Sequence, residues 1–225
     1  MKNEYSKIFD KPCYLIGKGI QIEKIETLQT YIPSGKPLRF VYTGNIGDER
    51  YKVLADIAKA MKETFADGAA VLDVYSMTPL TKKMQEAFSG NSCLKFHGGI
   101  NRERVIQVQE EADFLVHVEG FSKKAIFSAK MSFSTKIIDY MMTGKPIFAV
   151  GPQEVNSIQV LKGNELGVVA TSQEELKEKL LDIVEAKIDY EKQIECKKGY
   201  LKKHRDIGVI QFEIFSRMNN LLKNN

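Results

Sequence analysis

Short apolar runs alternate with longer amphipathic segments from residue 38 onward, and this alternation strongly limits the folds that the chain can adopt. Most of the short runs are apolar throughout rather than at every second position, which is typical of strands covered on both faces of a parallel sheet. The expected strands are Leu38–Thr43, Ala70–Tyr75, Leu94–His97, Phe114–Val118, Ile147–Val150 and Gly167–Ala170.

The segments between these runs carry apolar residues at helical spacing. Ser172 and Glu175 have the spacing of a capping box, so they predict the start of a helix. Strands that alternate with helices through right-handed crossovers give a doubly wound, Rossmann-like α/β fold with a parallel sheet. The clearest apolar stripe on one helix face consists of Leu54, Ile57, Ala58, Met61 and Phe65.

Both ends of the chain fall outside this alternation. We expect residues 1–37 to be a lead-in, with "CYLIGKGI" (13–20) and the Pro/Gly-rich "IPSGKP" (32–37), residues 38–188 to be the Rossmann-like domain, and residues 189–225 to be C-terminal helices. The basic run "KKGYLKKHR" (197–205) is interpreted either as a solvated helix face or as a surface for anionic lipid or a partner domain.

Composition excludes several classes of protein. A net charge of +4 over 225 residues is too weak to predict nucleic-acid binding. Cys13, Cys93 and Cys196 lie far apart, which argues against a zinc site or a disulfide framework. The chain shows no signal-peptide pattern and no apolar run long enough to span a bilayer. We therefore expect a cytoplasmic protein that holds no metal.

Three loops are expected at the carboxyl ends of the strands, where open parallel sheets bind their ligands. They follow the first, third and fourth strands and contain basic residues, and two of them are rich in glycine. In the first loop, Gly44 and Gly47 permit close approach of the backbone to a ligand, and Arg50 supplies a cation. The loops cover residues 44–50, 98–104 and 119–135.

The stretch "FSTKIIDYMMTGKPIFAV" (133–150) begins a helix at the same edge of the sheet. Ser134 or Thr135 is expected as the N-cap, so the free backbone N–H groups and Lys136 form an anion site. Asp139 follows about one turn later, where a carboxylate accepts hydrogen bonds from the diol of a ribose. Together with the first loop, these residues predict a cradle for a nucleoside diphosphate.

Each of these residues also has a purely structural interpretation. A Ser-Thr pair often only caps its helix, and Arg50 on a first helical turn is commonly solvated. Asp139 can simply favour the N-terminal half of a helix. His97 and His117, at strand ends, are more often core or rim residues than ligands. The sequence contains neither a G-x-G-x-x-G nor a Walker A pattern.

The order of these motifs resembles the C-terminal, donor-binding domain of GT-B glycosyltransferases, most like the retaining family 4 type. The resemblance covers about residues 38–188. Glu119-Gly120-Phe121 matches the start of the family signature, and Asp139 precedes the Gly144-Lys145-Pro146 stop as the second acid of the signature does. Residues 120–138 form a longer spacer between the two acids than the family has, and the second acid is Asp rather than Glu.

The resemblance implies a role for each candidate residue. Glu119 is the candidate catalytic residue and Asp139 binds the ribose. Asn45 stands where many members have Arg. The diphosphate is bound by Gly44, Asn45, Gly47, Arg50, Ser134, Thr135 and Lys136, and the base contacts His97, Gly98 and Ile100.

By this resemblance, the chain is the donor-binding half of a metal-independent glycosyltransferase of polysaccharide biosynthesis. Such an enzyme transfers a sugar from a nucleotide diphosphate, UDP- or GDP-linked, to a glycan or lipid-linked acceptor, without a cofactor. The expected partner is an N-terminal acceptor-binding domain, on the same chain or a second one, with peripheral membrane contact in the full-length protein. The alternatives are a non-catalytic nucleotide-sugar-binding or scaffold module and a GT-B sugar-nucleotide epimerase.

Overall fold

The computed structural model describes residues 2–10, 13 and 17–223, so residues 14–16 of the lead-in motif "CYLIGKGI" lie outside the described chain. Within this part, a parallel six-stranded sheet has the order β3-β2-β1-β4-β5-β6. This confirms the predicted Rossmann-like fold. The strands are β1 (Leu38–Thr43), β2 (Ala70–Tyr75), β3 (Leu94–Gly98), β4 (Phe114–Val118), β5 (Ile147–Val150) and β6 (Val168–Ala170).

Two strand ends differ from the prediction by one residue. β3 includes Gly98, because the backbone N–H of Ser76 donates to the Gly98 carbonyl at 2.9 Å and extends the ladder past a register shift in β2. β6 begins at Val168 rather than Gly167. A Cβ at Gly167 would overlap the Ile147 carbonyl oxygen, so a glycine is needed for this close approach of two backbones.

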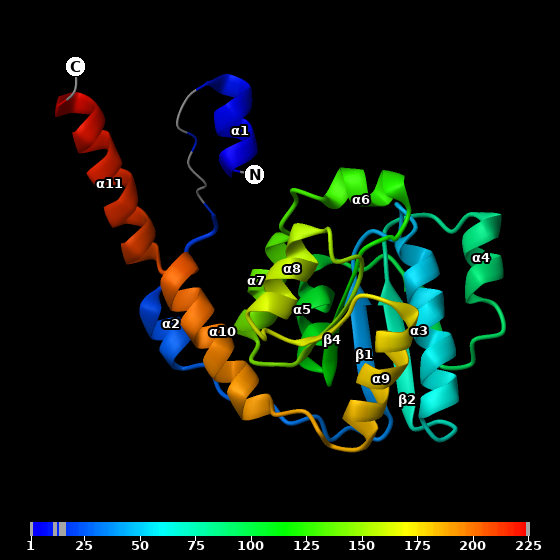
Figure 1. Ribbon diagram of the computed structural model, residues 1–225. Helices are drawn as coiled ribbons and strands as arrows, with labels where there is room; N and C mark the ends of the chain where they lie inside the picture. The colour runs from blue at the N-terminus through cyan, green and yellow to red at the C-terminus, as the bar shows by residue number, and fades with distance from the viewer. Residues whose placement is uncertain (1, 11–12, 14–16, 224–225) are drawn as a thin grey trace.

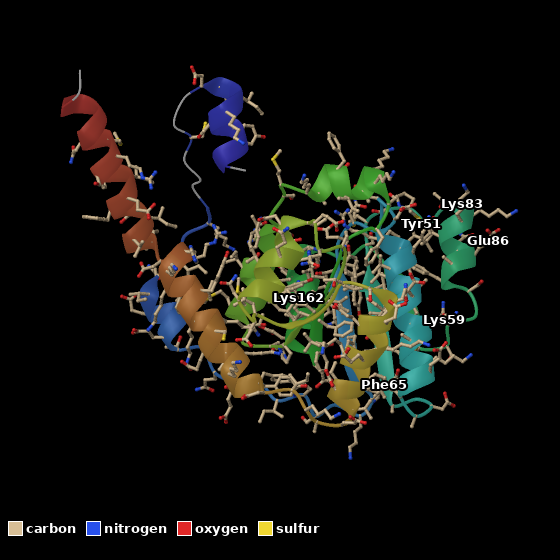
Figure 2. All side chains as sticks on the ribbon, in the orientation of Figure 1. Tyr51, Lys59, Phe65, Lys83, Glu86 and Lys162 are labelled. Carbon is tan, nitrogen blue, oxygen red and sulfur yellow. The ribbon has the colours of Figure 1, made fainter. Side chains whose placement is uncertain are left out.

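One face of the sheet is covered by α3 (Arg50–Thr64), α4 (Lys82–Phe88) and α9 (Gln173–Val184) (Figure 1). Phe40 and Phe114 stack at the centre of this face with ring centroids 4.5 Å apart. Figure 2 shows Lys59 on α3 and Lys83 and Glu86 on α4, all exposed on the outer side of the layer. The predicted apolar stripe of α3 therefore faces the sheet and its charged side faces solvent.

The other face is covered by α5 (Arg102–Glu110), α7 (Thr135–Met142) and α8 (Asn156–Gly163), with α2 (Ile22–Glu26) and α10 (Tyr190–Arg205) packed in the same apolar core. The long loop expected at 119–135 contains a further helix, α6 (Lys123–Ala129). Ser122 caps it by accepting a hydrogen bond from the Ala125 backbone N–H at 3.2 Å.

The tail consists of α10 and α11 (Ile207–Lys223), as expected for C-terminal helices. α11 projects away from the sheet (Figure 1), and its Phe212 and Phe215 are exposed. α1 (Lys2–Phe9) lies in the lead-in. None of the helices in the described part of the chain is long and apolar enough to cross a membrane.

The basic run at 197–205 is not solvated along its whole length. Lys197 is buried, and its ammonium donates to the Lys145 carbonyl at 2.7 Å. Burial lowers the pKa of Lys197 to about 7. Only the exposed members of the run, such as Lys202 and Lys203, fit either interpretation, a solvated face or a binding surface.

Asp113 fastens the lead-in to the amino end of the sheet. Its carboxylate accepts hydrogen bonds from the Tyr31 hydroxyl (2.9 Å) and from the backbone N–H groups of Ser34, Gly35 and Arg39 (3.2, 3.1 and 2.8 Å). Burial, followed by the bond to Asp113, raises the pKa of Tyr31 to about 12. The carboxyl ends of the strands, on the opposite side of the sheet from these hydrogen bonds, are not covered by them.

Candidate functional site

A cavity of about 870 Å³ lies at the carboxyl ends of β1 and β2, between α5 and α7. Its position is the one at which an open parallel sheet binds ligands. Its lining comes from the lead-in, from the loops after β1, β2 and β3, and from α5 and α7. The lining residues are Lys18, Thr43, Gly44, Asn45, Tyr75, Ser76, Met77, Thr78, Pro79, Ile100, Arg102, Val105, Ile106, Gln109, Lys136, Asp139, Tyr140, Met142 and Thr143.

The cavity brings together some of the residues predicted from the sequence and leaves others outside. Gly44, Asn45, Ile100, Lys136 and Asp139 line it. These include candidates for the diphosphate, the ribose and the base, drawn from three separate segments of the chain. The predicted residues that do not line the cavity are Gly47, Arg50, His97, Gly98, Glu119, Ser134 and Thr135.

Thr43, the last residue of β1, connects both helices of the cavity. Its hydroxyl accepts a hydrogen bond from the Gln109 amide nitrogen at 2.9 Å and bonds to the Tyr140 hydroxyl at 3.2 Å. Burial raises the pKa of Tyr140 to about 12, so this hydroxyl stays protonated. Sequence reasoning missed Thr43, Gln109 and Tyr140, whose spacing in the chain shows no recognisable pattern.

Lys136 provides the cation beside the first loop. Its ammonium donates to the Thr43 carbonyl at 2.7 Å and lies 4.9 Å from the centre of the Tyr42 ring. Burial, with a further contribution from Arg50, lowers the pKa of Lys136 to about 8. Lys136 is on the first turn of α7, where Ser134 is the N-cap residue without a capping bond from its own side chain. Cation and helix N-terminus thus occupy the same corner.

Asn45 holds the loop after β1 in place. Its side-chain oxygen accepts hydrogen bonds from the Gly47 backbone N–H at 2.6 Å and from the Thr78 hydroxyl at 3.1 Å. Its carbonyl accepts the Tyr42 hydroxyl at 2.6 Å. The side chain therefore joins the loop after β1 to the loop after β2, and both loops line the cavity.

Arg50 and Glu119, predicted as a phosphate-binding cation and a catalytic residue, are paired with each other. Two guanidinium nitrogens of Arg50 donate to the same Glu119 oxygen at 3.0 and 2.8 Å. His117 Nε2 lies 3.5 Å from the other Glu119 oxygen and 3.1 Å from the Ser157 hydroxyl. This pair occupies the carboxyl end of β4 and does not line the cavity.

Burial controls the charges in this cluster. It raises the pKa of Glu119, with Arg50 acting in the opposite direction. Burial also lowers the pKa of His117 to about 3, so the imidazole is neutral near pH 7. Arg50 and Glu119 therefore form a satisfied, mostly buried ion pair beside a neutral histidine.

Asp139 stands at the mouth of the cavity. Its side chain is 51% exposed and forms an ion pair with the ammonium of Lys18, which is 49% exposed. Lys18 lies in the lead-in, outside the predicted domain at 38–188. It is far from Asp139 in the chain, so no local motif indicated it.

His97 belongs to a polar network at the edge of the sheet. Its Nε2 lies 2.7 Å from an Asp73 carboxylate oxygen, and its ring stacks on Tyr75 with centroids 4.5 Å apart. The other Asp73 oxygen accepts two bonds from Arg39, at 3.2 and 3.0 Å. Tyr75 lines the cavity, so His97 contacts a residue of the cavity wall without lining the cavity itself.

Much of the remaining lining of the cavity is apolar, although Ser76, Thr78 and Arg102 also contribute to it. Met77 and Ile106 are 81% and 51% exposed, and they line the cavity with Pro79, Ile100 and Val105. A cavity lined by several apolar side chains and a few polar and charged groups suits a ligand with an apolar part and a charged part. No group of three or more His, Cys, Asp or Glu residues in the described ranges is placed to hold a metal ion.

No protein-family model matches the sequence, and no curated protein matches it. Solved structures do match. A glycosyltransferase from Rickettsia africae superposes with a TM-score of 0.71 at 10% identity, over 100% of this chain and 62% of that chain. The HepE protein of Anabaena in complex with UDP superposes with a TM-score of 0.65 at 13% identity, over 93% of this chain and 58% of that one.

The pneumococcal O-GlcNAc transferase GtfA, in complex with UDP and GlcNAc, has a TM-score of 0.63 at 11% identity, over 98% of this chain and 43% of that one. The chain thus has the Rossmann-like fold of GT-B glycosyltransferase domains. It spans less than two thirds of the length of these three structures.

Proposed function

We propose that this chain binds the nucleoside diphosphate part of a nucleotide-sugar, as the C-terminal, donor-binding half of a glycosyltransferase most like family 4. The complete enzyme transfers a sugar, from a UDP- or GDP-linked donor, to a glycan or lipid-linked acceptor. The observation that carries the proposal is the cavity at the carboxyl ends of β1 and β2, which is lined by Gly44, Lys136 and Asp139.

The diphosphate belongs at the corner formed by Gly44, Asn45 and the first turn of α7. Lys136 lines the cavity and provides a positive charge there, and it lies on the first turn of α7, where a helix N-terminus favours an anion. Both groups stabilise the negative charge that develops on a leaving diphosphate. This part of the proposal requires no metal ion.

The ribose and the base belong along the rest of the cavity. Asp139 is accessible at the mouth and accepts hydrogen bonds from ribose hydroxyls. The apolar wall formed by Met77, Ile100 and Ile106 suits the face of a nucleobase. Two of the matched structures are complexes with UDP.

Binding is tested by a thermal-shift screen of residues 1–225 against UDP, GDP, ADP and CMP, their sugar conjugates and the free nucleosides. A ligand that binds only the native state at about 100 times its Kd adds about 2.7 kcal/mol of stability. We expect a shift with a diphosphate, a smaller one with its nucleoside, and loss of this difference in Lys136→Met. Equal shifts for the diphosphate and its nucleoside would refute the phosphate site.

In this proposal, sugar transfer also requires an acceptor-binding domain. Positioning both substrates supplies about 7–11 kcal/mol of a reaction barrier, and one Rossmann-like half positions only the donor. We expect residues 1–225 to bind the donor but to release free nucleotide at near-background rates with any acceptor extract. Acceptor-dependent release by this chain would show that its site is complete.

The arrangement of Arg50 and Glu119 favours a second candidate, a non-catalytic nucleotide-sugar-binding module. Both residues are engaged with each other outside the cavity, so a catalytic role for Glu119 requires the pair to separate. Donor hydrolysis or transfer by the full-length protein distinguishes the two candidates. Loss of that activity in Glu119→Gln, with donor binding retained, supports the enzyme, whereas a full-length protein that binds donor without turnover supports the module.

A further inference from the structure

We propose that Lys18 is a specificity-determining residue of the cavity, and that with Asp139 it forms a clamp for the vicinal hydroxyls of a ribose. This inference rests on the proposed nucleotide binding, and it adds a residue from the lead-in that no motif indicates. Lys18 and Asp139 both line the cavity, and their half-exposed charged groups form an ion pair.

Both partners of this pair keep hydrogen-bonding capacity for a ligand. Lys18 contacts one oxygen of Asp139, and about half of each side chain remains exposed. An ammonium has three N–H donors and a carboxylate has two acceptor oxygens. The pair therefore leaves the second carboxylate oxygen and further ammonium donors accessible from the cavity.

A donor and an acceptor side by side match a vicinal diol better than a carboxylate alone does. Each ribose hydroxyl both donates and accepts hydrogen bonds. Asp139 can only accept, so the hydroxyl oxygens need a donor, and Lys18 is the cation that already contacts Asp139. A sugar that lacks both hydroxyls leaves the clamp with no partner, so the clamp distinguishes ribose from dideoxyribose.

The backbone two residues after Lys18 is held by hydrogen bonds, although the Lys18 side chain is exposed. The Ile20 backbone N–H donates to the Arg205 carbonyl at 2.7 Å, and the Ile207 N–H donates to the Ile20 carbonyl at 2.9 Å. Ile20 is buried. These bonds anchor Ile20, and so the end of the segment 17–20, to the junction of α10 and α11.

Arg205 supports the same segment from the side of α7. A Cβ at Gly17 would overlap the Arg205 guanidinium, so the two lie in close contact. The Arg205 guanidinium carbon lies 5.3 Å from the centre of the Phe133 ring, immediately before the start of α7. Lead-in and tail together hold Lys18 over the helix that carries Asp139.

The test compares UDP with 2′,3′-dideoxy-UDP by isothermal titration calorimetry on residues 1–225, with GDP and its dideoxy analogue in parallel. Lys18→Met is expected to lower the affinity for the ribonucleotide about three- to tenfold. This is the loss expected for one charge-assisted hydrogen bond whose strength is reduced by solvent exposure. The dideoxy analogue should bind Lys18→Met and the unmodified protein equally. Lys18→Arg, which keeps the charge and the donors, should retain most of the affinity.

The matched control is Lys24→Met, which removes an exposed lysine of the same lead-in that does not line the cavity. It should leave both affinities unchanged. In a double-mutant cycle, Lys18→Met in an Asp139→Asn background should add little, because residues that act on one ligand group are not additive. Thermal unfolding of each variant should stay at the midpoint of the unmodified protein.

Three outcomes contradict the inference in different ways. Equal losses for the ribonucleotide and its dideoxy analogue would assign Lys18 to the phosphates and overturn the clamp. Unchanged affinity in Lys18→Met would overturn the role of Lys18 and leave the proposed nucleotide binding intact. Failure of the unmodified protein to bind either UDP or GDP would overturn both.

Discussion

Asp113 and Asp139 are two aspartates at opposite ends of the strands of the same sheet, and they differ in burial and in the number of hydrogen bonds that they accept. Asp113 precedes β4 at the amino edge, is 2% exposed, and accepts four hydrogen bonds from the lead-in and β1. Asp139 lies on α7 near the carboxyl ends of the strands, has a half-exposed side chain, and contacts one half-exposed lysine, Lys18. The first carboxylate is saturated by the protein, whereas the second has capacity left for a ligand.

Asp113 stabilises the fold, whereas Asp139 has hydrogen-bonding capacity left for a ligand. A buried carboxylate must find its donors within the chain, because losing them costs the full desolvation of a charge. An exposed ion pair adds little to stability, so its value lies in what else it binds. Arg50 and Glu119 resemble Asp113 in this respect, because each charge is paired with another group of the protein.

The largest expected effect is on stability, from Asp113→Ala. Removing this buried carboxylate leaves four partly buried donors without their acceptor, so we expect the free energy of unfolding to fall by about 3 kcal/mol. Urea unfolding monitored by circular dichroism measures it. Folded Asp113→Ala should bind UDP as the unmodified protein does, because Asp113 lies at the amino ends of the strands and the cavity lies at their carboxyl ends. A loss below about 0.5 kcal/mol would remove the contrast with Asp139.

A smaller effect, on binding alone, is expected from Asp139→Asn. Losing the charge of the acceptor should weaken UDP about tenfold, while the free energy of unfolding stays within about 0.5 kcal/mol. Calorimetry and urea unfolding on one preparation give both values. If the variant unfolds more easily and each folded molecule keeps its affinity, Asp139 is a structural residue like Asp113.

The smallest effect is a pH dependence caused by Lys136, whose pKa is lowered to about 8 by burial. As pH rises through 8 the folded protein loses this proton, so UDP affinity should fall a few-fold between pH 7 and 9. The unfolded chain keeps the proton longer, so stability contributed by Lys136 should rise over the same window. A UDP affinity that falls with pH while the free energy of unfolding rises would indicate deprotonation of Lys136.

Lys136→Arg serves as the control, because arginine stays protonated throughout this range. Its UDP affinity should not change between pH 7 and 9. An equal fall of affinity in the unmodified protein and in Lys136→Arg would assign the titration to another group.

Most of the fold could be predicted because its signal is local. Continuous apolar runs marked the strands, and Ser172 with Glu175 marked the start of α9, where the Glu175 N–H indeed donates to the Ser172 hydroxyl at 3.2 Å. α6 was missed, because a short helix within a polar loop has too few turns for a clear apolar stripe.

The candidate site was predictable only in part, because its remaining contacts join distant segments. Gly44 follows a predicted strand, Lys136 and Asp139 lie on the first turns of a predicted helix, and the structure places all three on one cavity. Lys18 reaches the cavity from the lead-in, and no spacing rule connects it to Asp139. The pairing of Arg50 with Glu119 was also hidden, since a sequence does not reveal whether a cation faces a ligand or a neighbouring acid.

The most direct test of the account is a crystal structure of residues 1–225 with UDP or, if the screen favours it, GDP. We expect the diphosphate within hydrogen-bond distance of the Lys136 ammonium and the first backbone N–H groups of α7, with the ribose hydroxyls at Asp139. A diphosphate bound by Arg50 away from Lys136, or a nucleotide in the separate cavity lined by Phe121, Pro152 and Thr171, would contradict it.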